Sequence, residues 1–392
     1  MRTSFIRFAM RSPPVPVEAR RAVRRGLPVK IREIRTHRLV APLHTPFVTA
    51  LARLTTVSTV VVEILDDDGR SGFGEAPEVW TVTGSSLASA EACVAQIFRP
   101  LLVGRAAEDL IGNCRSVSAA VVGNESAKAA VDVALHDLAA RRLGVPLAHL
   151  LGGARLTVPT DVTVSAGDAD GLADAAVQRV GEGYRVLKVK VGTDANGDVA
   201  RVAAVRAAAG PDVEIRLDAN QGWTPREAVR VIRALEESGA GVAFVEQPVH
   251  HRDIEGLAWV SDRVETPIMA DEAVFGVADL VEVIRRRAAD MVNVKLAKSG
   301  GLRPARTLLE LAEAQQMATM VGSMLETEIG VGAAASLVAA YGTSVVSDLD
   351  AVWWLERGAV TGGMRYEGAT VVLPETAGLG VTSVAPVGEP VT

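Results

Sequence analysis

Short apolar runs alternate with longer segments of helical periodicity through the second part of the chain. The runs predicted to be strands are residues 158–164, 186–191, 214–217, 242–245, 266–270, 291–296, 317–321 and 344–347. Each begins roughly 24 to 30 residues after the previous one, which is the length of one strand, one helix and two loops. Such units predict an α/β fold in which residues 151–354 close a parallel barrel of the TIM type. A doubly wound sheet is the alternative, but it requires a glycine-rich phosphate loop after its first strand, and none follows there.

A different pattern comes before the barrel. Alternation of apolar and polar positions predicts an antiparallel meander with strands at 31–39, 55–65 and 72–76. Helical spacing then predicts helices over residues 85–98, 107–118 and 126–143. Residues 29–150 are therefore predicted to form a separate α+β domain.

The first 28 residues differ from both parts. They contain seven arginines and one acid (Glu18), with Pro13, Pro14 and Pro16 between the arginines. An arginine-rich start is typical of a targeting segment, but this one has neither an apolar centre nor a small-residue cleavage site. We expect residues 1–28 to be a disordered extension or the product of an upstream start codon.

Composition narrows the class of protein. Hydrophobic residues make up 48% and charged residues 22%, as in soluble globular proteins. The net charge is -6 and no basic block interleaved with aromatics occurs in the body of the chain, so nucleic acid is not an expected partner. No apolar run has the length of a membrane span. Cys93 and Cys114 form no CxxC pair, which favours a reducing, cytoplasmic location.

Charged residues sit at the ends of the predicted barrel strands. Asp218 ends the run IRLD, Glu246 ends FVE, and Asp271 follows IMA. The carboxyl ends of parallel strands meet at one mouth of a barrel, where three carboxylates would repel one another unless a cation neutralised them. Oxygen ligands from separate strands suit Mg²⁺ better than zinc. His250 and His251 follow Pro248 in a loop and are expected to face solvent.

Three lysines accompany these carboxylates: Lys188 and Lys190 in LKVKV, and Lys295 in VNVKL. They are either counter-ions in a structural network or catalytic groups. In the catalytic interpretation, the KxK spacing places both strand lysines on one face. One lysine then lowers the pKa of the other by like-charge repulsion, helped by the nearby metal, until a neutral amine can act as a base. Lys295 would then approach from the opposite side. Two bases around one carbon are the arrangement of a racemase or epimerase.

The runs LKVKVG, LDANQGW, FVEQPV, MADEAV and NVKLAKSGG, with AAVDVALHDLAARRLGVPL earlier in the chain, resemble the muconate-lactonizing enzyme subgroup of the enolase superfamily. The resemblance extends over about residues 29–381 and is strongest to the dipeptide epimerases. It implies a modified (β/α)7β barrel with an N-terminal α+β capping domain, against which residues 355–392 pack back. It also implies Mg²⁺ held by Asp218, Glu246 and Asp271, and an enolate formed by removing the α-proton of a carboxylate substrate. Lys190 and Lys295 are implied to be the acid/base pair, and Lys188 to assist electrostatically and contact substrate.

The resemblance also implies substrate contacts. Asp348 and Asp350 in VSDLDA resemble a DxD pair that binds the N-terminal ammonium of a dipeptide, although paired acids at a strand end are often solvated or cap helices. Ser323 and Met324 are expected at the carboxylate end of the substrate, and Phe47 and Thr49 at its side chain. Trp353 and Trp354 depart from the family pattern after DLDA. Glu326 and Glu328 receive no role.

Side-chain selectivity is expected to come from a mobile loop at residues 43–55 and a second segment at 79–86. Candidates there are Phe47, Val48, Leu51, Trp80 and Val82, and Arg53 is a candidate for reading an acidic side chain.

The expected function is epimerisation of a dipeptide, like that of an L-Ala-D/L-Glu epimerase, by a homo-oligomer with a small-molecule carboxylate as its partner. Muconate cycloisomerase, o-succinylbenzoate synthase and N-acylamino acid racemase are alternatives of the same fold. A non-catalytic binding barrel is a distant alternative.

Overall fold

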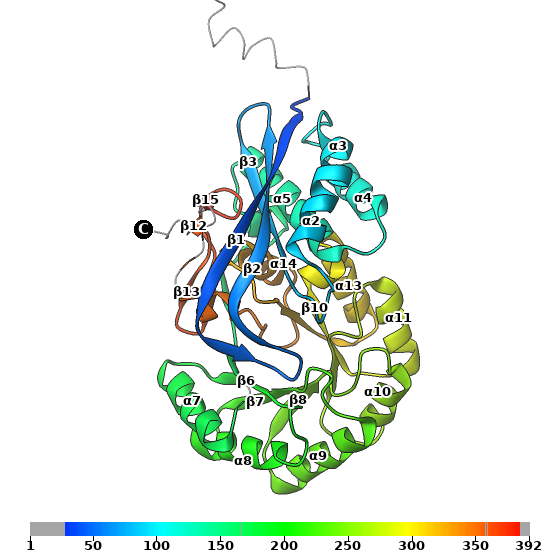
Figure 1. Cartoon of the computed structure of the whole chain (residues 1–392), viewed down its shortest axis with the longest axis vertical. Helices are drawn as coiled ribbons and strands as arrows, with labels where there is room; N and C mark the ends of the chain where they lie inside the picture. The colour runs from blue at the N-terminus through cyan, green and yellow to red at the C-terminus, as the bar shows by residue number, and fades with distance from the viewer. Residues whose placement is uncertain (1–27, 166, 357, 359, 385–392) are drawn as a thin grey trace, which may run out of the picture.

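A computed structural model describes residues 28–384 apart from 166, 357 and 359. The expectation for residues 1–28 falls almost wholly outside this part of the chain. Two bodies of structure are visible in Figure 1: an antiparallel sheet with its helices, and below it a ring of strands surrounded by helices. No helix in the part of the chain that the structure describes has the length and apolarity needed to span a membrane.

The N-terminal sheet is a meander of β1 (Ile31–Val48), β2 (Arg53–Asp66) and β3 (Ser71–Pro77), paired in that order. Most of the segment 43–55, predicted to be a loop, is strand. Phe47 pairs with Leu54 and Val48 with Arg53, so only residues 49–52 turn between two long strands. The hairpin extends to the ring of barrel strands in Figure 1. It is fastened there because the Val48 N–H donates to Ser165 Oγ at 2.6 Å.

Helices cover one face of this sheet. They are α2 (Leu87–Cys93), the π-helix η1 (Val94–Phe98), α3 (Arg99–Leu102), α4 (Leu110–Ala120), α5 (Glu125–Leu143) and α6 (Leu147–Leu150). Helix α5 lies directly on β3. A Cβ at Gly72 would stand 2.3 Å from Ala134 O, and one at Gly74 would stand 2.0 Å from Ala130 O. Only glycine permits this close approach of helix and strand.

Seven parallel strands follow one another around the barrel in chain order. They are β5 (Val162–Val164), β6 (Val186–Lys190), β7 (Glu214–Asp218), β8 (Val242–Glu246), β9 (Ile268–Ala270), β10 (Met291–Lys295) and β11 (Ala318–Gly322). The outer helices are α7 (Ala169–Gly181), α8 (Asp198–Ala209), α9 (Pro225–Ser238), α10 (Ile254–Ser261), α11 (Val277–Arg286), α12 (Leu296–Ser299), α13 (Leu302–Ala314) and α14 (Glu328–Tyr341). A helix in each crossover is what parallel neighbours require.

The eighth predicted strand, 344–347, is not a regular strand. It makes isolated parallel bridges, Thr160 to Ser347 and Gly322 to Asp348, so it joins β11 to the chain before β5 and closes the ring. The predicted first strand is divided as well. Residues 157–159 form β4, which pairs antiparallel with the C-terminal β14 (Thr370–Val372), and only β5 enters the barrel. The (β/α)7β fold is thus confirmed with these two corrections.

The C-terminal segment contains η2 (Ala351–Trp354), β12 (Val360–Gly362), β13 (Arg365–Glu367), β14 and β15 (Val381–Val384). It contacts both bodies of structure. The Tyr366 hydroxyl donates to Leu349 O at 2.5 Å, and the Leu379 N–H donates to Asp137 Oδ1 of α5 at 2.6 Å.

Candidate active site

Five neighbouring barrel strands bring charged side chains to one mouth. Lys190, Asp218, Glu246 and Lys295 are the last residues of β6, β7, β8 and β10, and Asp271 directly follows β9. Since the strands are neighbours in that order, the sequence across the mouth is lysine, three carboxylates, lysine. All five side chains are buried.

Ion pairs join these groups. Lys190 Nζ lies 2.7 Å from Asp218 Oδ2, and Lys295 Nζ lies 2.8 Å from Asp271 Oδ2. The two predicted base candidates therefore pair with carboxylates from different strand ends, Asp218 on β7 and Asp271 directly after β9. Lys190 lies on the same side of β6 as Lys188, as the KxK spacing predicts, because Lys188 Nζ reaches the same Asp218 oxygen at 3.0 Å.

Lys188 connects the carboxylates with the segment that closes the barrel. Its Nζ lies 2.8 Å from Glu246 Oε2 and 2.7 Å from Asp348 Oδ2. Its side chain is only 1% exposed. A fully buried ammonium surrounded by three carboxylate oxygens is a fixed positive charge.

Carboxylates rather than a neighbouring lysine govern the pKa values of Lys188 and Lys295. Burial lowers the pKa of Lys188, but Asp218, Asp348 and Glu246 outweigh it and raise that pKa well above its usual value. Burial is likewise outweighed at Lys295, whose pKa is raised chiefly by Asp271. The pattern of the sequence showed the neighbouring lysines but not how closely each ammonium would be paired.

The carboxylates fit a magnesium ion by their chemistry. Asp218, Glu246 and Asp271 offer only oxygen ligands from three separate strands. Glu246 Oε2 and Asp271 Oδ1 are buried and accept no hydrogen bond, and their contacts are the ammonium groups of Lys188 and Lys298 at 2.8 and 2.6 Å. Burial and the neighbouring Asp218 raise the pKa of Glu246 to about 7. Such a crowded set of carboxylates is relieved by a bound cation.

Asp348 and Asp350 both line the same cavity, but their surroundings differ. Lys188 outweighs burial at Asp348 and lowers its pKa. Asp350 Oδ2 accepts from the Thr163 N–H at 2.7 Å and from Trp354 Nε1 at 3.1 Å. Burial and the charge of Asp348 raise the pKa of Asp350 to about 6. Neither acid is a solvated loop charge.

The cavity has a volume of about 330 Å³, within the usual size of a small-molecule site. It brings together twelve of the expected residues: Phe47, Thr49, Leu51, Trp80, Val82, Lys190, Asp271, Lys295, Ser323, Met324, Asp348 and Asp350. Arg53 and Val48 are not there; they line a second cavity with His44, Trp353 and Arg179. His251 also lies elsewhere, since its Nδ1 hydrogen-bonds Gln221 Oε1 at 2.7 Å.

Several polar residues of the site were not predicted from the sequence. Lys298 is buried, and its Nζ donates to Asp271 O and, at 3.1 Å, to Asn293 O. Asn293 Nδ2 in turn donates to Glu246 Oε1 at 2.9 Å. Lys298 stands in the motif NVKLAKSGG, so its position in a predicted strand-end motif was the available signal.

Glu326, for which the sequence suggested no role, lies at the junction of the two bodies of structure. Burial and the charge of Glu75 raise its pKa well above the usual value. Glu75, on β3, accepts hydrogen bonds at Oε1 from the N–H groups of Thr327 and Gly330 at 2.7 and 2.9 Å. The α14 N-terminus is therefore held by a carboxylate from the N-terminal sheet.

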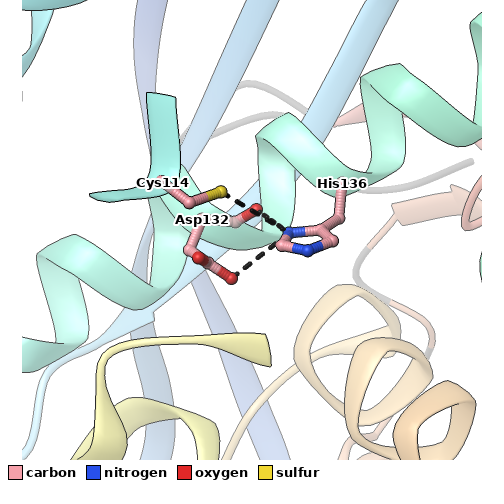
Figure 2. A group of neighbouring side chains, drawn as sticks. All are labelled: Cys114, Asp132 and His136. Atoms are coloured by element: carbon pink, nitrogen blue, oxygen red, sulfur yellow. Dashed lines mark hydrogen bonds and ion pairs between the residues drawn. The ribbon is translucent and has the colours of Figure 1, made fainter. Parts of the chain in front are cut away.

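A second group of metal-ligand types lies away from the barrel mouth. Figure 2 shows Cys114 of α4 beside Asp132 and His136 of α5, all buried. Their polar atoms are already used: His136 Nδ1 donates to Asp132 O at 2.7 Å, and Asp132 Oδ1 accepts from the Leu302 N–H at 2.8 Å. Burial strongly raises the pKa of the Cys114 thiol, which opposes the thiolate form that binds metals. We assign this group to the attachment of α5 to α13.

The fold and the site together define a barrel enzyme with buried lysines and carboxylates at the barrel mouth. Residues 31–152 match the family model described as mandelate racemase / muconate lactonizing enzyme, N-terminal domain, and residues 171–385 match the one described as enolase C-terminal domain-like. The chain belongs to the mandelate racemase and muconate lactonizing enzyme family of the enolase superfamily.

Particular relatives resemble it over nearly their full length. The L-Ala-D/L-Glu epimerase of Bacillus subtilis is 42% identical over 358 residues, covering 91% of this chain and 98% of the relative. The structure of that epimerase with substrate has a TM-score of 0.88 to this chain, at 42% identity, and covers 91% of this chain and 99% of that one. The dipeptide epimerase of Enterococcus faecalis, in complex with Mg and L-Leu-L-Tyr, has a TM-score of 0.86 at 36% identity, covering 91% and 100%. The predicted family and enzyme class are thereby confirmed.

Proposed function

We propose that the protein is a magnesium-dependent epimerase that inverts the α-carbon next to the carboxylate of a dipeptide. The observation that carries the proposal is the order of side chains across the barrel mouth. Lys190 and Lys295 lie on either side of the three strands that end at Asp218, Glu246 and Asp271. Inversion at carbon requires the incoming proton to reach the face opposite the one from which a proton left. Two amines on opposite sides of a shared site meet that requirement.

The proposed roles follow from the contacts of each side chain. One lysine of the pair, as a neutral amine, takes the α-proton, and the other, as an ammonium, gives a proton to the opposite face; the reverse reaction exchanges their roles. Asp218, Glu246 and Asp271 would hold Mg²⁺, which when bound would stabilise negative charge developing on the substrate carboxylate. It would also offset the carboxylate charge that raises the pKa of Lys295, and so favour the neutral amine.

Lys188 is proposed to act through its charge rather than as a base. Its buried ammonium is held by Asp218, Glu246 and Asp348, so it cannot turn toward another group without leaving buried carboxylates unpaired. In this position it adds positive charge beside the carbon that becomes electron-rich.

Asp348 and Asp350 are proposed to bind the N-terminal ammonium of the substrate. Their acidic pair lines the cavity that Lys190 and Lys295 also line. Ser323, whose N–H donates to Asp348 O at 3.2 Å, and the adjacent Met324 would contact the substrate backbone. Muconate, o-succinylbenzoate precursors and N-acylamino acids have no ammonium group, so this acidic end favours a dipeptide over those alternatives.

We also propose that the barrel and the N-terminal α+β domain have different roles in the reaction. The catalytic groups come from the barrel, within residues 151–354, whereas residues 29–150 cap the cavity and contact the side chain through Phe47 and Thr49. A cytoplasmic location is proposed from the free thiols of Cys93 and Cys114. The expected homo-oligomer stays a prediction.

The proposal is tested by incubating the protein with Mg²⁺ and a set of L,L-dipeptides in heavy water. We expect deuterium at one α-carbon, in both the epimerised product and the recovered substrate. Mass spectrometry measures deuterium incorporation, and chiral chromatography measures epimerisation. If no dipeptide shows exchange or epimerisation, the proposed function is wrong. The Asp348→Asn variant should lose activity on dipeptides and keep it on an N-acylamino acid if any such substrate turns over.

A further inference from the structure

The part of the cavity wall that residues 29–150 contribute is largely apolar. Leu51, Ala52, Leu54, Val79, Trp80 and Val82 line it. Three of these side chains are unusually exposed for large apolar residues: Leu51 at 36%, Leu54 at 40% and Trp80 at 67%. Exposed apolar side chains gathered around a cavity favour a ligand that covers them with apolar surface.

The charges around the cavity point in the same direction. Among the described residues that line it, the cations are Lys190 and Lys295, and each already pairs with a carboxylate of the proposed metal site. The one charged group on the side of the N-terminal sheet is Glu78, which is an acid. An acidic substrate side chain placed there would lose water without gaining a counter-ion, and Glu78 would repel it.

Phe47 connects this wall to the reacting centre. Lys190 Nζ lies 5.6 Å from the centre of the Phe47 ring, and Phe47 stands two residues before the turn at 49–52. A substituent on a carbon beside Lys190 therefore meets Phe47 and then Leu51 and Leu54. With the substrate carboxylate at the metal ligands and the ammonium at Asp348 and Asp350, that substituent is the side chain of the epimerised residue.

Arg53 does not supply a cation to the apolar part of the cavity wall. In the β1–β2 hairpin Leu54 pairs with Phe47, whereas Arg53 pairs with Val48. Successive residues of a strand point to opposite faces, so Arg53 and Leu54 are directed to different sides. Leu54 lines the cavity of Lys190 and Lys295, and Arg53 lines the second cavity with Trp353. The expectation that Arg53 reads an acidic side chain is therefore corrected.

We propose that the residue epimerised by this protein carries an uncharged, apolar side chain of the size of leucine or phenylalanine, and that an acidic side chain is rejected. This rests on the proposed function, since it assigns the substrate of that same site. It separates the chain from the Bacillus subtilis relative, whose substrate is L-Ala-D/L-Glu.

The test compares L-Ala-L-Leu, L-Ala-L-Phe and L-Ala-L-Glu as substrates of the wild-type protein with Mg²⁺ in heavy water. We expect kcat/KM for the first two to exceed that for L-Ala-L-Glu by at least ~10-fold, because only they cover the apolar wall without burying a charge. An equal or higher kcat/KM for L-Ala-L-Glu would overturn the specificity while leaving the epimerase intact. If none of the three dipeptides, and none of a wider set, exchanged its α-proton for deuterium, the proposed function itself would be wrong.

Substitutions in the cavity wall test the same side-chain specificity by changing the protein instead of the substrate. Trp80→Ala removes an exposed ring, so the fold should be retained, and kcat/KM should fall for L-Ala-L-Leu but much less for L-Ala-L-Ala. Ala52→Arg places a guanidinium in the wall and should raise the ratio of Glu to Leu activity. Arg53→Ala is the matched control at the next position, and it should leave that ratio unchanged. A loss of Glu activity specific to Arg53→Ala would show that Arg53 does read the side chain and would overturn the assignment.

Discussion

The indole N–H of Trp354 donates to Asp350 Oδ2 over 3.1 Å, on the carboxylate oxygen that also accepts the Thr163 N–H. The same ring stacks on His44 at 5.7 Å and meets the edge of Phe47 at 4.9 Å. Trp354 thus connects the proposed ammonium-binding acids to the hairpin that covers the cavity.

The acidic limb of the pH profile tests the Trp354–Asp350 bond. A donated hydrogen bond stabilises the ionised carboxylate, so Trp354→Phe should raise the pKa of Asp350 above its value of about 6. The pH below which kcat/KM for a dipeptide falls should be about one unit higher in the variant. The variant should therefore lose activity near pH 6 and keep it near pH 8. Phenylalanine keeps the contacts with His44 and Phe47.

The control for this variant is Trp353→Phe. The Trp353 ring lies over the Arg179 guanidinium at 4.1 Å and its side chain makes no hydrogen bond with the Asp350 carboxylate within the described structure. Its pH profile should match that of the wild type. A limb that stays in place in Trp354→Phe would mean that the indole does not tune Asp350.

Magnesium should stabilise the folded protein as well as support turnover. A ligand that binds only the folded state at 100 times its Kd adds about 2.7 kcal/mol to the free energy of unfolding. We therefore expect the thermal midpoint to rise with added Mg²⁺ and to fall back with a chelator. Glu246→Gln should retain the hydrogen bond from Asn293 and lose most of this rise. A midpoint that responds equally to Mg²⁺ in the variant would place the ion elsewhere.

The junction between β3 and α14 should weaken as pH rises toward neutrality. Burial raises the pKa of Glu75 from 4.5 to about 7, so its protonated form is favoured in the folded state. The associated stability is complete below 4.5 and is lost as pH rises through 7; one such group contributes on the order of 3 kcal/mol. The charge of Glu328 adds to the rise in the pKa of Glu75, and the charge of Glu75 helps to raise the pKa of Glu326.

The Glu75→Gln variant isolates this contribution. Its amide oxygen can still accept the N–H groups of Thr327 and Gly330, and its amide nitrogen can donate to the Thr327 hydroxyl. Denaturant unfolding should show a smaller loss of stability between pH 4.5 and 7 than in the wild type. Glu237→Gln, on the surface of α9, is the control. Identical slopes for the wild type and Glu75→Gln would contradict the raised pKa.

The sequence predicted the charged strand ends correctly because their geometry is local. A residue that ends a parallel strand lies at the mouth whatever the rest of the chain does, so Asp218 and Glu246 could be placed from the apolar runs before them. Lys298 could not, because its Nζ returns to Asp271 from a short helix after β10, and helical spacing does not predict that return.

Other features that the sequence did not reveal share the same cause. The pKa of Lys188 depends on the sum of three carboxylates from different strands, not on its neighbour in KxK. The side of the hairpin to which Arg53 points is set because β2 begins at that residue, where a loop was expected. In each case a side chain was placed correctly in the sequence but its surroundings were set by pairing at long range.

The two-base arrangement of Lys190 and Lys295 is tested most directly by hydrogen exchange in Lys190→Ala and Lys295→Ala, using both epimers of L-Ala-Leu in heavy water with Mg²⁺. If the lysines serve opposite faces of one carbon, both variants lose epimerisation. Each then keeps α-proton exchange with one epimer only, the L,L form for one variant and the L,D form for the other. Circular dichroism confirms that both variants are folded. Epimerisation that persists in either variant, or exchange retained with the same epimer in both, would contradict the account.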